Sequence, residues 1–99
     1  MGGPDVDARL LEEYGRIEGV AILDEDGKVW ALSPPRRHHD LIRWLASSGR
    51  PTPIRGEQGF ITSRGRFVRR KPALRLARAA GQVLRETAPA HGLFSEDVW

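Results

Sequence analysis

Basic side chains dominate the middle of this sequence, and the chemistry that suits them is the binding of anions. Between residues 36 and 85 there are thirteen arginines and lysines and only two acids. Arg36 and Arg37 precede an expected helix, whose free N–H groups and positive dipole end favour phosphate. Guanidinium groups hold phosphate through charge-assisted hydrogen bonds. This stretch favours a nucleotide, a nucleic acid or an acidic protein as partner, although a solvated arginine-rich surface has the same composition.

Two phenylalanines lie within this basic stretch. Phe60 and Phe67 are surrounded in the sequence by five arginines. Aromatic rings stack on nucleobases while guanidinium groups hold the phosphates, so the segment has the residue types of a nucleotide site. Packing in the core is the commoner role of phenylalanine in so short a chain, and we expect at least one of the two rings to be core.

No constellation points to catalysis or to a metal. The serines lack a G-x-S-x-G motif, the glycines fit neither phosphate-loop pattern, and there is no cysteine. His38 and His39 are adjacent and would point apart on a helix, which is poor geometry for a shared metal ion. We therefore expect a protein that is not an enzyme and that has no metal site and no cofactor.

The length and charge of the chain limit which classes of protein it can belong to. The chain has 99 residues, enough for one small domain that is expected to rely on a partner subunit. Its net charge of +3 conceals an acidic segment at residues 1–27 and a strongly basic one at residues 28–99. No apolar run is long enough to span a membrane, and the first residues lack the pattern of a signal peptide, so a cytoplasmic protein is expected.

Four strands are expected, arranged in two hairpins. Residues 17–23 and 28–32 flank an acidic turn that contains Gly27. Residues 58–62 and 66–69 flank a second short turn and contain β-forming residues.

One main helix follows each hairpin. Apolar residues at helical spacing predict helices over 38–48 and 72–87, with Pro72 at the first position of the second helix. We expect a tail at 93–99 that docks on the domain, because it ends in tryptophan. The predicted fold is α+β, in the order β-β-α-β-β-α, with a small antiparallel sheet and both helices packed on one face.

The first sixteen residues are expected to stand apart from this domain. Residues 5–14 have acids suited to a helix N-terminus but few apolar residues, so a short helix and a loose, disordered segment both fit. The predicted division is an N-terminal segment, 1–16, and a single ligand-binding domain, 17–99.

Several short motifs, in this order and spacing, resemble a family of small phage proteins that includes the first-described Thoeris anti-defence proteins. They are Arg-His-His-Asp at 37–40, Glu-Gln-Gly-Phe at 57–60, Gly-Arg-Phe-Val at 65–68, an alanine-rich helix followed by Gly-Gln at 81–82, and Phe-Ser-Glu-Asp-Val-Trp at 94–99. Together they cover most of the chain.

The resemblance implies a non-enzymatic sponge for cyclic nucleotide signals, acting in the host cytoplasm. Such proteins sequester cyclic ADP-ribose isomers, and some also bind cyclic oligonucleotides, in pockets between the subunits of a homo-oligomer. On this reading Phe60 stacks on the adenine, and Ser95 and Asp97 either accept ribose hydroxyls or lock the tail. The resemblance also assigns arginines to the ligand's diphosphate: Arg36 or Arg37, Arg66 and Arg85. Arg70 matches the family pattern and is a further ligand-binding residue on this reading.

The sequence departs from the family pattern at one position, and two alternative functions stay open. The family often has a small polar residue where this chain has Arg69, which puts an expected sugar contact in doubt. A basic stripe of Lys71, Arg75, Arg78 and Arg85 on the second helix is the argument for a nucleic-acid-binding module. The acidic N-terminal segment and Trp99 would instead suit a module that binds a host protein.

Overall fold

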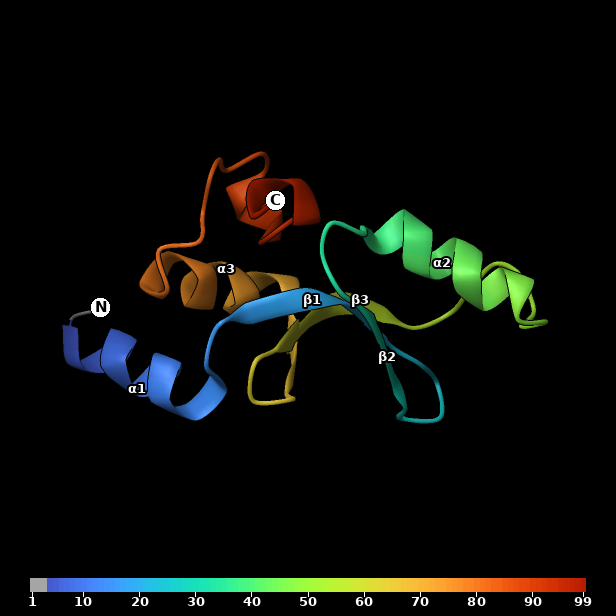
Figure 1. Ribbon diagram of the computed structural model, residues 1–99, viewed down its shortest axis with the longest axis horizontal. Coiled ribbons are helices and arrows are strands. Elements are labelled where there is room, and N and C mark those ends of the chain that lie inside the picture. The colour runs from blue at the N-terminus through green and yellow to red at the C-terminus, as the bar shows by residue number, and fades with distance from the viewer. Residues whose placement is uncertain (1–3) are drawn as a thin grey trace.

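The expected hairpins and helices form one mixed α+β architecture. A computed structural model describes residues 4–99. The strands β1 (Ile17–Leu23), β2 (Val29–Leu32), β3 (Glu57–Thr62) and β4 (Phe67–Arg69) pair antiparallel in the order β2-β1-β3-β4. The helices α2 (His38–Ser47) and α3 (Arg70–Ala79) lie on the same side of this sheet (Figure 1). The predicted fold class is thereby confirmed.

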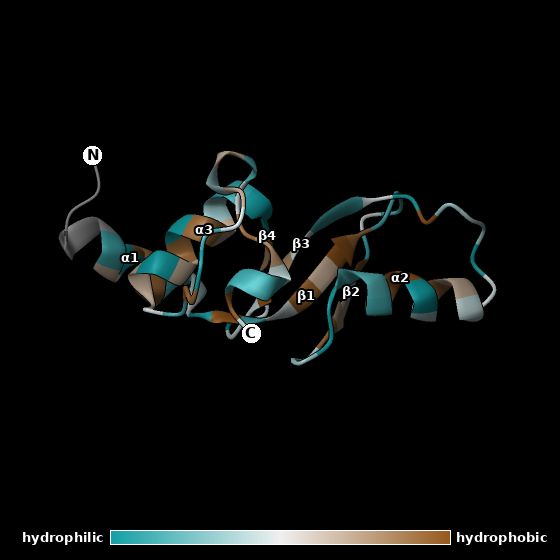
Figure 2. Ribbon diagram, turned by 90° about the horizontal axis from the view of Figure 1, so that it is seen from above, coloured by the Kyte–Doolittle hydropathy of each residue, from teal (hydrophilic) through white to brown (hydrophobic). Residues whose placement is uncertain are grey.

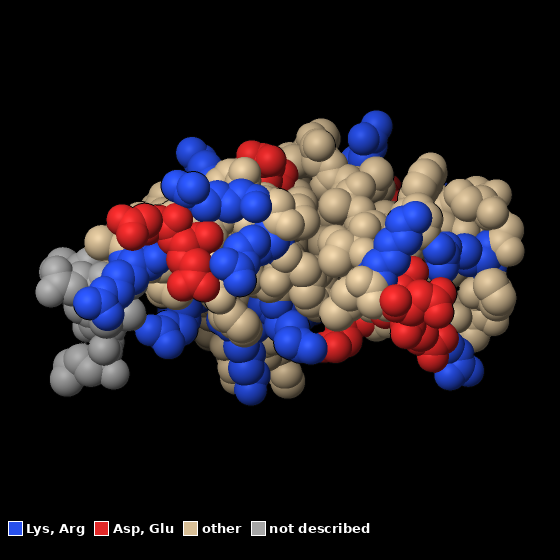
Figure 3. Space-filling view, turned by 90° about the horizontal axis from the view of Figure 1, so that it is seen from below, with Lys and Arg blue, Asp and Glu red and all other residues tan. Residues whose placement is uncertain are grey.

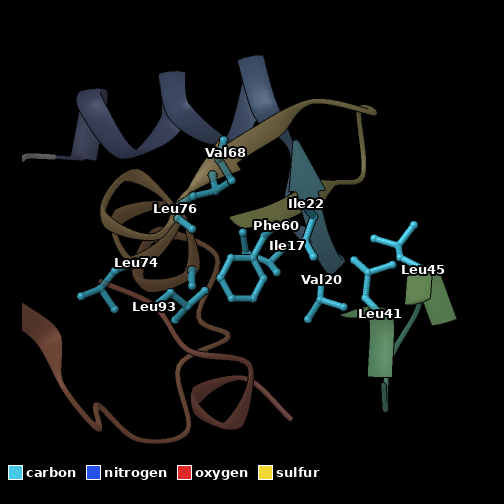
Figure 4. Packing of buried hydrophobic residues seen from close by; sticks show 12 residues of the cluster. Ile17, Val20, Ile22, Leu41, Leu45, Phe60, Val68, Leu74, Leu76 and Leu93 are labelled. Carbon is cyan, nitrogen blue, oxygen red and sulfur yellow. The ribbon is translucent and has the colours of Figure 1, made fainter. Parts of the chain in front are cut away.

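The core lies between this face of the sheet and the two helices. Val20, Phe60 and Val68 are cross-strand neighbours in one row of the sheet, and all three are buried. Leu41 and Leu45 of α2 pack near one end of the cluster, and α3 packs over Phe60 (Figure 4). In Figure 2 the hydrophobic residues concentrate along β1, at the centre of a molecule that measures 45 × 25 × 21 Å.

The helix α3 is shorter than the predicted helix over residues 72–87, and it starts two residues earlier. It begins at Arg70, so Pro72 is its third residue, where its missing N–H costs no intrahelical bond. It ends at Ala79 because Gly81 adopts a left-handed conformation with φ +69°. The N–H of Gln82 then donates to the carbonyl of Ala77 at 2.9 Å and closes the helix end. The prediction of a helix over 72–87 was wrong in both bounds.

Residues beyond α3 bind other parts of the chain instead of extending the helix. The Gln82 amide accepts from the Ile17 N–H and donates to the Ile17 carbonyl, each at 2.8 Å. The N–H of Leu84 donates to the carbonyl of Asp97 at 2.7 Å. Two short 3-10 helices, η1 (Pro89–His91) and η2 (Ser95–Asp97), then lead the tail back across the domain.

Of the expected N-terminal segment, residues 1–3 lie outside the described range, and Pro4–Tyr14 form the helix α1. Leu10 and Tyr14 of this helix lie beside Val68 and Leu76 at the edge of the core. Within the described residues, none of the helices has both the length and the apolar content to cross a bilayer.

Candidate ligand-binding groove

An open groove runs between the end of β2 and the outer face of α2. Ser33, Pro34 and Pro35 end the strand, because proline donates no hydrogen bond to a sheet. On α2, positions 40, 43, 44 and 47 share one face, since they follow the spacing of neighbours on a helix. The groove measures about 600 Å³ and is lined by Leu32, Pro35, Arg36, Asp40, Arg43, Trp44 and Ser47.

Trp44 is the aromatic surface of this groove. Its side chain is 47% exposed, the most exposed of the three tryptophans. The Trp30 ring lies 5.7 Å from the Trp44 ring, centre to centre, and steadies it from one side. Trp30 is itself held by a hydrogen bond from its Nε1 to Asp24, 2.8 Å long, and by the Arg50 guanidinium 4.3 Å from its ring centre. The exposed Trp44 ring is therefore held in place by a Trp30 ring that is itself fixed.

Two arginines flank the exposed ring. Within the described part of the chain, no hydrogen bond or ion pair joins the guanidinium of Arg36 or of Arg43 to another residue. Asp40 lies between them, and its Oδ2 accepts the Arg37 N–H at 2.8 Å. This hydrogen bond, helped by the charges of His39, Arg43 and Arg36, lowers the pKa of Asp40. Asp40 is thus occupied at the helix N-terminus, and the two guanidinium groups remain open to an anion.

An aromatic face with two open guanidinium groups can hold a base and its phosphates. Stacking on a base is worth about 1–3 kcal/mol, and arginine–phosphate hydrogen bonds are among the strong ones. The volume of the groove lies within the range of small-molecule sites.

Phe60 does not belong to this groove. Its side chain is 0% exposed, and its ring meets the edges of His38, at 5.1 Å, and Trp99, at 6.4 Å, between ring centres. No face of the ring is open to a base. In this structure Phe60 is therefore a core residue and does not have the stacking role that was expected of it. The expectation that at least one phenylalanine is core is met by Phe60.

Four of the expected site residues meet where the tail docks. Arg37 donates to the Ser95 hydroxyl at 3.3 Å and to the Trp99 carbonyl at 2.6 Å. Arg70 donates to the Leu93 carbonyl at 2.9 Å, and burial lowers its pKa. We call this group, with Asp97, the tail clamp.

Asp97 is the buried acid of the tail clamp. Its carboxylate accepts the Thr87 N–H at 3.0 Å, the Thr87 hydroxyl at 2.6 Å and the Phe94 N–H at 2.9 Å. Burial alone would raise the pKa of Asp97, but these hydrogen bonds outweigh it and leave the pKa lowered. Of the two roles expected of Ser95 and Asp97, locking the tail is the one that these contacts serve.

The remaining predicted arginines lie elsewhere. Arg66 pairs with Glu13 of α1 at 3.4 Å and lies over the Tyr14 ring. Arg85 donates to the Glu96 carbonyl, beside the tail. Of the predicted site residues, Arg36 therefore lines the groove and the others lie elsewhere.

The expected basic stripe is interrupted as well. Arg78 makes a two-point hydrogen bond to Glu86, and Arg85 lies beyond the end of α3. Arg69 pairs with Glu57 across the second hairpin, so its charge is matched within the chain.

Sequence reasoning missed Arg43 and Trp44 as site residues, because Trp44 is one of the apolar residues whose spacing predicts the helix over 38–48. The signal was present: Asp40, Arg43, Trp44 and Ser47 share a face that excludes the buried residues Leu41 and Leu45. Among the described residues, no three histidine, aspartate or glutamate side chains gather closely enough to hold a metal ion.

Comparison with known proteins identifies the family. Residues 15–99 match the family described as Phage T4 y16D protein, which covers both hairpins, α2, α3 and the tail. No curated protein and no solved structure matches the chain. The match supports the expectation of a phage protein. The chain belongs to the phage T4 y16D protein family.

Proposed function

We propose that this phage protein binds a small phosphorylated nucleotide non-covalently and holds it unaltered. The observation that carries the proposal is the groove in which Trp44 lies exposed between the open guanidinium groups of Arg36 and Arg43. Trp44 would stack on the base, and the two arginines would hold the phosphates. No chemical step is needed, so the protein acts as a binder and not as an enzyme.

The resemblance of several motifs to those of the Thoeris anti-defence proteins suggests which nucleotide this is. We propose a cyclic ADP-ribose isomer, or a cyclic oligonucleotide, as the ligand. Such a signal carries a base for Trp44 and several phosphate charges for the arginines. In the host cytoplasm the protein would lower the concentration of free signal by mass action and so block the defence that depends on it.

Sequestration requires tight binding. A nanomolar dissociation constant corresponds to about −12 kcal/mol. One stacked base and two arginine contacts reach this value only in a site that is preorganised and partly dry. The groove of a single chain is open along one side, so we also propose that the protein works as a homo-oligomer.

Isothermal titration calorimetry with cyclic ADP-ribose isomers and cyclic dinucleotides tests the proposal. Trp44→Ala should weaken binding by about tenfold or more, the value of one stacking contact. Arg36→Ala combined with Arg43→Ala should weaken it by about 100-fold. Arg75→Ala, which removes an exposed arginine of α3, is the matched control and should leave binding unchanged.

Two results would contradict the proposal. The first is the absence of heat with all these ligands. The second is equal binding by the wild type and the Arg36/Arg43 double variant. Tight binding to DNA or RNA, falling steeply with salt, would indicate the nucleic-acid-binding alternative instead. Mass spectrometry of ligand released from the complex checks that it leaves with its mass unchanged.

A further inference from the structure

The sheet has a second face, opposite the helices, whose apolar side chains lie outside the core. In the strand register, alternate residues point to this side. None of its larger apolar residues belongs to the core cluster or packs against it. We call this surface the open face and define it by five residues: Leu23, Val29, Ala31, Ile61 and Phe67.

The centre of the open face is shallow because small residues occupy it. Ala21 pairs with Ala31 on one side and with Gly59 on the other. Glycine at 59 leaves room for the Phe67 ring, since a Cβ there would lie 2.7 Å from the ring. The Phe67 ring thus lies over Gly59. The register also places Glu57 and Arg69 on this side, where they pair with each other. A largely apolar sheet face is typical of an interface.

Turns of opposite charge stand on either side of the open face. Both hairpin turns project away from α2 and α3, one near each end of the sheet (Figure 1). The acidic turn, residues 24–28, holds three acids and one lysine. The basic turn, residues 63–66, holds two arginines and no acid, and of these Arg66 pairs with Glu13 while Arg64 is exposed. Seen from this side, uncharged surface lies between an acidic cluster at one end and a group of basic and acidic residues at the other (Figure 3).

This arrangement is complementary to itself. A two-fold axis that lies parallel to the open face and perpendicular to the line between the turns would bring two open faces together. The same rotation sets the acidic turn of each copy against the basic turn of the other, so both contacts form at once. A copy of the same chain therefore matches this surface in both apolar character and charge.

We propose that the open face is the surface through which two copies of this protein associate, with the acidic turn of one against the basic turn of the other. This contact is separate from the association proposed above to enclose the groove, because the open face and α2 lie on opposite sides of the sheet. The proposal does not depend on the identity of the ligand, and its test contains no ligand. A failure here would therefore leave the groove proposal standing, and the reverse also holds.

Sedimentation equilibrium over a concentration series measures the association. The wild type should dimerise, and more weakly as salt is raised. Arg64→Glu should raise the dimer dissociation constant by about tenfold or more, and so should Glu25→Arg combined with Asp26→Arg. Arg75→Glu makes the same charge change on α3, on the other side of the sheet, and should leave the dimer intact.

Mixing the two variants gives the sharpest result. The Arg64→Glu chain has acid at both turns, and the Glu25→Arg/Asp26→Arg chain has base at both turns. Each should dimerise poorly alone, and the equal mixture should form a heterodimer. Recovery of this kind also shows that both variants are folded.

Three results would overturn the proposal. The wild type could stay monomeric throughout the series, the variants could dimerise as well as the wild type, or the mixture could fail to associate although circular dichroism shows both chains folded.

Discussion

Replacing Phe60 by alanine should remove a large part of the stability of this protein. The side chain is fully buried at the centre of the core, between β1, α3 and the tail. Truncation of such a phenylalanine costs roughly 3–5 kcal/mol. The edge-on contacts with His38 and Trp99 add about 0.5–1.5 kcal/mol each, which places the loss near the upper end of the range.

This loss is large compared with the total. Small domains have a free energy of unfolding of about 5–15 kcal/mol. For a chain of this size, each kcal/mol lowers the melting temperature by about 4–8 °C, so the decrease should exceed about 12 °C. Urea and thermal unfolding, followed by circular dichroism, measure both quantities.

Phe60→Leu separates the core role from the stacking role. Leucine retains an apolar side chain at the same place, so this variant should remain folded with a smaller loss of stability. If Phe60 is core, the folded leucine variant binds ligand as the wild type does, whereas a stacking residue would lose its contact. The reasoning is refuted if Phe60→Ala costs less than about 1 kcal/mol, or if the folded leucine variant loses ligand binding.

Three further predictions concern stability. Asp97→Asn should cost about 1–3 kcal/mol, because an amide cannot accept all the hydrogen bonds that this carboxylate receives. Folding lowers the pKa of Asp97, so the contribution of this carboxylate to stability is complete well above the ordinary pKa of 3.8. That contribution is lost as the pH falls through the lower folded-state pKa. Urea unfolding of the asparagine variant should lack this pH dependence. Burial lowers the pKa of His38 to about 4, so the unfolded state binds the proton more tightly, and stability should fall as the pH drops from about 6.5 to about 4; an NMR titration with a midpoint near 6.5 would contradict this. Gly92→Ala should destabilise far more than Gly49→Ala in thermal unfolding, because both have positive φ but only at Gly92 would the new Cβ meet backbone, 2.3 Å from Arg70; equal losses would show that this close approach is relieved cheaply.

Local patterns were enough to predict the hairpins and the first main helix. Strands on each side of short turns were found because alternation and turn residues act over a few positions. The helix at His38–Ser47 also matches its prediction closely, since an apolar stripe at helical spacing is followed by Gly49 and Pro51.

The end of the second helix depended on contacts that are distant in sequence. Val83 and Leu84 continue the apolar stripe of residues 73–80, and so the sequence pattern favours a longer helix. In the structure, Gln82 is bound to Ile17, 65 residues away, and Leu84 to the tail. These contacts are stronger than the local preference, which is worth only tenths of a kcal/mol per residue.

The sequence by itself determined the elements, the α+β class and the abundance of arginine that points to an anionic partner. Only the tertiary structure decided which arginines are open to that partner. Arg37 and Arg70 hold the tail while Arg36 and Arg43 flank a groove, although all four side chains have the same chemistry. The physical reason is that a guanidinium group pairs with whichever acceptor the packed chain brings near it, and that neighbour is set by the fold and not by the residue type.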